Sequence, residues 1–111
     1  TPECEAGYRA IVPEESSWEN LAPARIAFVV TLYRPIAQAG KIRCPVFLVA
    51  GEEDSICPLP LVQRLARRIP GSMLMLIPTG HFAPYTGEWF EKVSEAQVQF
   101  LTQVLRPEPV R

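Results

Sequence analysis

The strongest constraint on this chain comes from two short apolar segments. The first, residues 46–50 (VFLVA), follows Cys44-Pro45 and ends at Gly51, and the second lies within residues 72–78 (SMLMLIP). Each segment is too short for a helix. In neither do apolar residues alternate with polar ones, as they would in a strand with one solvent-exposed face. Both therefore predict strands of a parallel sheet that is covered on both faces.

The residues between these two segments predict a helix. From Pro60 to Ile69 apolar residues recur at helical spacing, polar positions form the opposite face, and Pro70-Gly71 ends the pattern. A strand, a helix and a second strand joined by short turns form the crossover unit of a parallel sheet. Two strands do not make a stable sheet, so the chain needs further strands from a longer polypeptide, a dimer or a partner protein.

The flanking segments are less regular. Residues 1–17 show little periodicity and predict a loop or a partly ordered arm. A helix is predicted from Trp18 or Leu21 to Tyr33, and its second half is apolar on nearly every side. Such a helix is either buried on several faces or requires a partner surface from outside the chain. Residues 86–105 predict a last helix, because apolar residues recur there every three or four positions.

Composition excludes several classes of protein. Hydrophobic residues make up 48% of the 111 residues and charged residues 21%, as in an ordinary soluble globular domain. The net charge is −1, with no cluster of lysines or arginines, so neither nucleic acid nor an anionic membrane is an expected partner. The longest apolar run, at about residues 26–33, is far too short to span a membrane.

Three cysteines, Cys4, Cys44 and Cys57, match neither an even disulfide framework nor a spacing of metal ligands. We therefore expect reduced thiols in a cytoplasmic protein, with Cys57 as the one that could be reactive. The chain begins at Thr1 rather than at a methionine, which suggests a processed product or a fragment.

Polar residues follow both predicted strands. The segment 51–54 (GEED) comes after the first strand and the segment 78–81 (PTGH) after the second. The carboxyl ends of parallel strands meet at one edge of a sheet, so an acid and an imidazole are expected side by side there. Taken singly, Asp54 could cap the next helix and His81 could be structural. Together they favour catalysis, because a carboxylate fixes the tautomer of a histidine and stabilises its imidazolium.

These motifs resemble the last third of the α/β-hydrolase fold. In that family a Cys-Pro, an apolar strand and Gly-x-x-Asp-x-x-x-Pro precede the helix, and a Gly-His follows the next strand. The matching residues here are Cys44, Pro45, Gly51, Asp54, Pro58, Gly80 and His81. The resemblance covers about residues 41–105, and it implies that Asp54 is the triad acid and His81 the triad histidine.

The resemblance also implies how the chain is organised. Residues 1–40 correspond to a loop plus a helix leading in from the cap or preceding helix region. Residues 41–106 correspond to the β-α-β-α end of an α/β-hydrolase domain, and residues 107–111 to a frayed tail. The expected fold is α/β, the C-terminal portion of an α/β-hydrolase, with two parallel strands and three main helices that need further strands or a dimer to complete the sheet.

The chain departs from the family at the nucleophile. The family carries it in Gly-x-Ser-x-Gly, and the chain order of its triad is Ser, acid, His. None of the six glycines here is followed two residues later by Ser, Cys or Asp, and the loop that supplies oxyanion donors comes from earlier strands. We therefore expect this chain to be inactive alone, with the nucleophile upstream of Thr1 in a longer protein.

The resemblance implies a serine hydrolase that cleaves a small-molecule ester, thioester or amide through an acyl-enzyme, without a metal or cofactor. His81 would act as general base and then as general acid, and Asp54 would orient it. Glu52 and Glu53 are weaker alternatives for the acid.

Two aromatic residues just past His81, Phe82 and Tyr85, could line a substrate pocket. Phe82 could equally pack the last helix on the sheet. The alternative to an enzyme is a non-catalytic binding or oligomerisation module derived from the same fold. In that case a homodimer or a domain swap would complete the sheet, and Asp54 and His81 would be relics.

Overall fold

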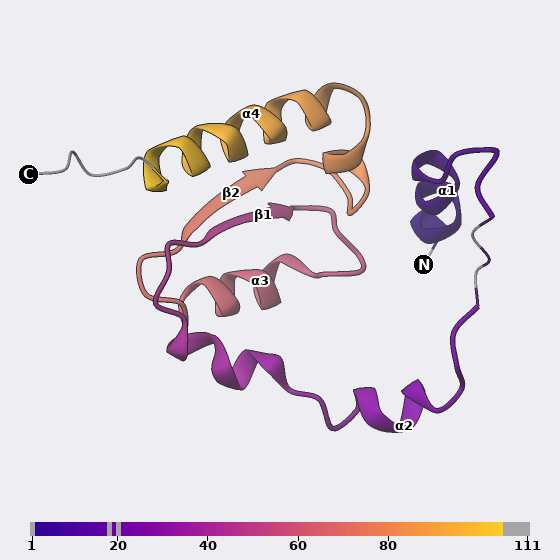
Figure 1. The fold of residues 1–111 in the computed structure, drawn as a ribbon, viewed down its shortest axis with the longest axis horizontal. Helices are drawn as coiled ribbons and strands as arrows, with labels where there is room; N and C mark the ends of the chain where they lie inside the picture. The colour runs from indigo at the N-terminus through magenta and orange to yellow at the C-terminus, as the bar shows by residue number, and fades with distance from the viewer. Residues whose placement is uncertain (1, 18, 20, 106–111) are drawn as a thin grey trace, which may run out of the picture.

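Two parallel strands lie at the centre of the computed structural model, which describes residues 2–17, 19 and 21–105. Strand β1 (Phe47–Gly51) pairs in parallel with β2 (Met73–Ile77). Phe47 lies opposite Met73, and the pairing continues in register to Gly51 opposite Ile77. Helix α3 (Leu59–Ala66) connects the strands and lies on one face of them, and α4 (Gly87–Val104) lies on the other (Figure 1). The predicted α/β arrangement is confirmed.

The core is small and the sheet is open. Its largest fully buried side chain is Ile77 at the end of β2, and Val93 of α4 is 2% exposed. Phe47 of β1 stacks on Phe100 of α4, with ring centroids 5.5 Å apart, which fixes the helix over the strand. On β2, however, Met73 remains 51% exposed. The described residues therefore bury only part of the apolar surface that these strands carry, as expected for a two-stranded sheet.

The predicted loop at the N-terminus was wrong. Helix α1 (Pro2–Ile11) occupies most of this segment and lies beyond the carboxyl ends of both strands (Figure 1). Its first turn holds Glu3 and Glu5, which suit the positive end of the helix dipole. Glu5 also forms an ion pair of 2.9 Å with Arg9 one turn later. Local charge placement, which an analysis of apolar periodicity overlooks, favours a helix here.

The long helix predicted up to Tyr33 was also wrong. Only a short helix, α2 (Ile26–Val30), forms there, and a 3-10 helix, η1 (Pro35–Lys41), follows it. Every large apolar side chain described between residues 21 and 33 is between 57% and 83% exposed. A helix takes most of its stability from packing its apolar face, and these residues have gained little such packing. Trp18, the alternative start of the predicted helix, lies outside the described residues.

The other predicted elements match the observed ones closely. The first strand is shifted by one residue from the predicted 46–50, and the helix expected from Pro60 to Ile69 is α3. The last helix, expected over residues 86–105, is α4, and a short 3-10 helix, η2 (Ala83–Tyr85), precedes it. The tail predicted for residues 107–111 lies outside the described residues.

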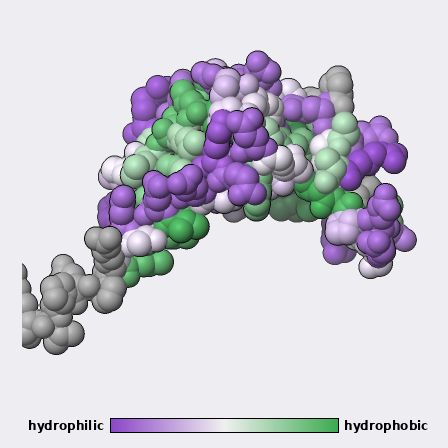
Figure 2. All heavy atoms as spheres, turned by 90° about the horizontal axis from the view of Figure 1, so that it is seen from above, coloured by the Kyte–Doolittle hydropathy of each residue, from purple (hydrophilic) through white to green (hydrophobic). Residues whose placement is uncertain are grey.

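The surface seen from the side of α4 mixes polar and apolar residues. Figure 2 shows hydrophobic patches on both sides of a hydrophilic band. Five of the exposed large apolar residues described lie on α4 or at its end: Phe90, Val98, Leu101, Val104 and Leu105. No helix among the described residues combines the length and the hydropathy that crossing a membrane requires.

Candidate active site

The two loops that leave the carboxyl ends of β1 and β2 lie against each other. The backbone N–H of Glu52 donates to the carbonyl of Ile77 at 2.8 Å, and that of Glu53 to the carbonyl of Thr79 at 3.1 Å. A Cβ atom on Gly51 would lie 2.4 Å from the Thr79 carbonyl oxygen, closer than real Cβ contacts allow. The glycine of the Gly-x-x-Asp motif is therefore required by the close approach of the second loop.

This approach brings Asp54 and His81 into contact. Asp54 Oδ2 lies 2.9 Å from His81 Nδ1, within hydrogen-bond distance. The other carboxylate oxygen, Oδ1, accepts hydrogen bonds from the backbone N–H groups of Ile56, at 2.8 Å, and Cys57, at 2.7 Å. The Asp54 side chain is 8% exposed and that of His81 is 28% exposed. The turn after β1 therefore holds the carboxylate so that Oδ2 faces the imidazole.

The charge on Asp54 follows from these contacts. Burial raises the pKa of its carboxyl group, but the hydrogen bonds from the Cys57 N–H, the His81 ring and the Ile56 N–H together outweigh it. The pKa therefore lies below the ordinary value of 3.8. An ionised carboxylate has no proton to donate, so His81 Nδ1 carries the proton of this hydrogen bond. In the neutral imidazole Nε2 is then left as the proton acceptor.

The sequence left Glu52 and Glu53 open as alternative acids. Both residues are exposed, and their backbone N–H groups take part in the contact between the loops. The carboxylate that reaches the imidazole is that of Asp54. The structure therefore places Asp54, rather than either glutamate, next to His81.

The two aromatic residues suggested for a substrate pocket lie in different surroundings. Tyr85 lines a pocket of about 430 Å³ together with Asp54 and His81, under the strand ends and beside α4. Phe82 instead lies between His81 and α1, with its ring centroid 5.1 Å from the His81 ring and 5.1 Å from that of Tyr8, edge-on to both. Only Tyr85 of the two lines the pocket beside Asp54 and His81.

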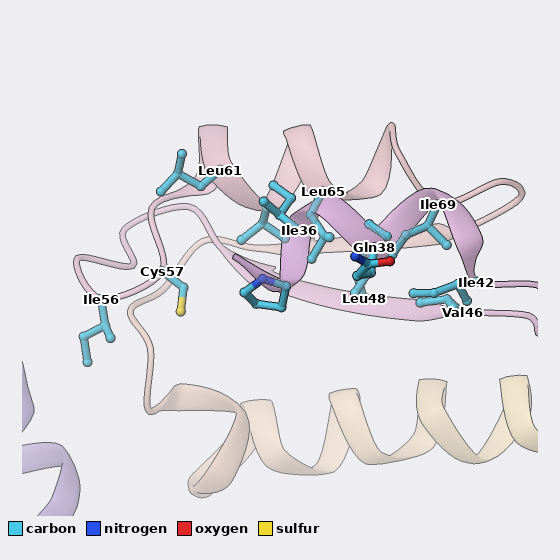
Figure 3. A pocket seen from close by; sticks show the side chains of 13 residues that line it. Ile36, Gln38, Ile42, Val46, Leu48, Ile56, Cys57, Leu61, Leu65 and Ile69 are labelled. Atoms are coloured by element: carbon cyan, nitrogen blue, oxygen red, sulfur yellow. The ribbon is translucent and has the colours of Figure 1, made fainter. Parts of the chain in front are cut away.

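A larger pocket of about 620 Å³ lies between η1, β1 and α3 (Figure 3). Its lining is almost wholly apolar, with Ile36 from η1, Ile42 directly after η1, Leu48 from β1 and Leu65 from α3. Among the described residues that line it, Cys57 alone has an ionisable side chain, and Cys57 also lines the smaller pocket. The larger space is therefore suited to packing against apolar groups, whereas Asp54 and His81 line the smaller one.

Cys57 lies close to the pair formed by Asp54 and His81. Its sulfur, a carboxylate oxygen of Asp54 and a ring nitrogen of His81 all lie within 4.8 Å of one another, so the three side chains could hold a metal ion. The spacing of cysteines along the chain could not reveal this set, because the ligands come from two different loops. An ion there would compete with the hydrogen bond between Oδ2 and Nδ1, which already pairs two of the three donors.

Glu3 of α1 also reaches these loops, and the sequence analysis did not single it out. Its carboxylate accepts hydrogen bonds from Ser55, next to Asp54, and from the backbone N–H of His81. These partners are 52 and 78 residues away along the chain. No local signal marks Glu3, because the contact exists only once α1 packs at the strand ends.

Comparisons with known proteins identify the family of the chain. The sequence model of a family described as "Serine hydrolase (FSH1)" matches residues 6–93. The quorum-quenching protein AidA of Acinetobacter baumannii (strain MDR-ZJ06) is 31% identical over 104 residues, a match that covers 94% of this chain and 34% of AidA. The chain thus spans about a third of the length of this relative.

A solved structure shows the same fold. The enol-lactonase from Burkholderia xenovorans LB400 superposes with a TM-score of 0.56 at 22% sequence identity, over 60% of this chain and 25% of the enol-lactonase. This likeness concerns the fold alone, whereas the family match spans most of the sequence, including both loops of the site. The chain therefore belongs to the FSH1 serine hydrolase family, whose fold is of the α/β-hydrolase type.

Proposed function

We propose that this chain is the acid–base end of a serine hydrolase, with Asp54 and His81 as two members of its catalytic triad. The observation that carries the proposal is the 2.9 Å contact between Asp54 Oδ2 and His81 Nδ1, formed where two neighbouring parallel strands end. Active sites of open α/β sheets lie at this edge. The family match supports a hydrolase, and the pairing of a carboxylate with an imidazole supports these two roles.

The roles follow from the protonation of the pair. With Nδ1 protonated and held by Asp54, the Nε2 atom of His81 takes the proton of a serine hydroxyl as the serine attacks a carbonyl carbon. The imidazolium then gives this proton to the leaving group, and water repeats the cycle to release the acyl group. Asp54 remains ionised throughout and stabilises the imidazolium, which its lowered pKa favours.

The serine and the oxyanion donors come from outside these 111 residues in this proposal. The chain spans about a third of AidA, which leaves ample room in a longer protein for the nucleophile. Residues 41–106 then supply the last strands and helices of the catalytic domain, and residues 1–40 lead into it from a cap or preceding helix. Alone, the chain has an acid and a base but nothing for them to activate, so we propose that it is inactive.

The substrate class is a small-molecule ester, thioester or amide. The enol-lactonase with the same fold acts on a lactone, which is a cyclic ester, and an ester is therefore the first substrate to test. The pocket of about 430 Å³ beside the pair, lined in part by Tyr85, is a candidate place for part of such a substrate.

The experiment compares the complete protein with variants of the pair, using p-nitrophenyl acetate hydrolysis and labelling by a fluorophosphonate probe. His81→Ala should lower kcat by about 10⁴-fold or more, since the base is lost, and labelling should slow in parallel. Glu52→Gln, which changes the charge of an exposed neighbour, should leave both rates unchanged. Full activity of His81→Ala, or hydrolysis by the 111-residue chain at the rate of the complete protein, would contradict the proposal.

The second candidate is a binding or oligomerisation module without catalysis. The exposed apolar residues of α2, with Phe28 at 80% exposure, favour an unpaired surface that another protein chain covers. In this case the 111-residue chain should form a stable, homogeneous dimer by light scattering, and His81→Ala should change nothing that the protein does. A complete protein that loses turnover on this substitution excludes this candidate.

A further inference from the structure

Helix α1 carries a carboxylate to the two loops that hold Asp54 and His81. Glu3 Oε1 accepts hydrogen bonds from the backbone N–H of Ser55, at 2.9 Å, and from the Ser55 hydroxyl group. Glu3 Oε2 accepts a hydrogen bond from the backbone N–H of His81, at 3.3 Å. One side chain therefore joins the residue that follows the acid to the histidine itself.

The surroundings of Glu3 and a second contact suit this position of α1. A Cβ atom on Gly80 would lie 2.4 Å from Glu3 Oε2, so the absence of a side chain in the Gly-His motif leaves room for the carboxylate. On the same helix, the Tyr8 ring meets the Phe82 ring edge-on, with centroids 5.1 Å apart. Aromatic pairs in this geometry are attractive, so α1 is attached to the histidine loop by an apolar contact as well as a polar one.

The carboxylate of Glu3 is charged in this position. The hydrogen bonds from the Ser55 hydroxyl and the Ser55 N–H lower its pKa, with a smaller contribution from the His81 N–H, and they outweigh the opposing effects of burial and of nearby Asp54. Hydrogen bonds to an ionised acceptor are stronger and shorter than those between neutral groups. Glu3 therefore binds both loops as an anion at neutral pH.

We propose that Glu3 is a positioning residue of the active site, which holds the loop of Asp54 and the loop of His81 at the separation that their hydrogen bond requires. The inference rests on the proposed function. A change at Glu3 can affect turnover through Asp54 and His81 only if these two residues are catalytic. Glu3 acts through Ser55 and the backbone N–H of His81, and it does not touch the reacting atoms. Small displacements of a catalytic group, of about 1 Å, can cost about 10²-fold in rate, so a contact that prevents them is worth testing.

Glu3→Gln in the complete protein is the first test, with p-nitrophenyl acetate as the substrate. An amide offers one acceptor oxygen, so if that oxygen keeps the two bonds from Ser55, the NH₂ group must face the N–H of His81. We expect kcat to fall by about 10- to 100-fold with KM almost unchanged, since the substrate is still bound. Glu5→Gln is the matched control, because Glu5 lies on the same helix, is itself exposed and pairs with exposed Arg9.

A double-mutant cycle separates positioning from general stability. If Glu3 acts through the pair, Glu3→Gln should have little further effect in an Asp54→Asn background, in which the hydrogen bond it supports has already been replaced. The same loss in both backgrounds, a loss that merely follows the unfolded fraction measured by circular dichroism, or wild-type kcat in Glu3→Gln would each overturn the inference. Full activity of His81→Ala would instead contradict the proposed function itself, so the two failures can be told apart.

Discussion

Replacing Asp54 by Asn gives the sharpest test of the acid's role, because the structure determines how the amide must lie. Two backbone N–H groups, those of Ile56 and Cys57, donate to the carboxylate oxygen Oδ1 at 2.8 and 2.7 Å. An amide turned the other way would face both donors with its NH₂ group. Leaving those two N–H groups without an acceptor would cost about 1 kcal/mol each in this partly exposed turn. The Asn oxygen therefore stays at Oδ1 and the NH₂ group takes the place of Oδ2.

This orientation reverses the hydrogen bond to His81. The NH₂ group donates to Nδ1, which must then be unprotonated, so the ring proton of the neutral imidazole moves to Nε2. An Nε2 atom that already carries a proton cannot accept one from a serine. We expect kcat of the complete protein to fall by about 10⁴-fold, equivalent to about 5.5 kcal/mol of transition-state stabilisation.

Asp54→Ala provides the comparison. It should lower kcat by a similar factor of about 10⁴, but it removes the acceptor of both N–H groups and should therefore destabilise the protein more than Asn does. Steady-state hydrolysis of p-nitrophenyl acetate and urea unfolding measure the two effects separately. An Asn variant that keeps more than a tenth of wild-type kcat would refute the reasoning, because the wrong tautomer should not support turnover.

Three further predictions concern stability. Ile77→Ala, at the fully buried end of β2, should cost about 2–5 kcal/mol in urea unfolding, whereas Leu101→Ala, at an exposed position on α4, should cost well under 1 kcal/mol. Equal costs would contradict the burial seen here. Gly51→Ala should destabilise by about 1–3 kcal/mol, because its Cβ would lie 2.4 Å from the Thr79 carbonyl oxygen, whereas Gly40→Ala, with its nearest atom at 3.5 Å, should not. Because folding lowers the pKa of Asp54 below 3.8, its ionised form adds stability above that pH, and this stability is lost as the pH falls through the lower folded value. The free energy of unfolding of Asp54→Asn should therefore depend less on pH in this acid range than that of wild type, and parallel curves would count against the ionised contacts.

The sequence alone determined the central part of the fold. The two apolar runs around residues 46–50 and 72–78 predicted buried strands, because a run without polar alternation must be covered on both faces. Their order and the helix between them predicted parallel pairing, which brings the strand ends together. The juxtaposition of Asp54 and His81 followed from these rules, because the sites of an open parallel sheet gather at one edge.

What the sequence could not determine depends on contacts between segments far apart in the chain. Residues 21–33 have an apolar pattern that predicted a long helix, yet only α2 forms, because a helix needs a surface to pack on. The helix at residues 2–11 was missed because its apolar residues form no clear stripe. Its charged residues favour a helix instead, with acidic side chains in the first turn and a basic one in the last.

Tertiary structure also decided the immediate surroundings of the pair. The proximity of Cys57 to the two side chains and the reach of Glu3 to both loops depend on where whole elements pack, and no spacing along the chain encodes that placement. The apolar pattern of a strand predicts which face of the sheet each side chain occupies, because local backbone geometry makes successive side chains alternate between the two faces. Which distant side chain meets that residue is decided only when the elements come together, because the stabilising contact does not exist until then.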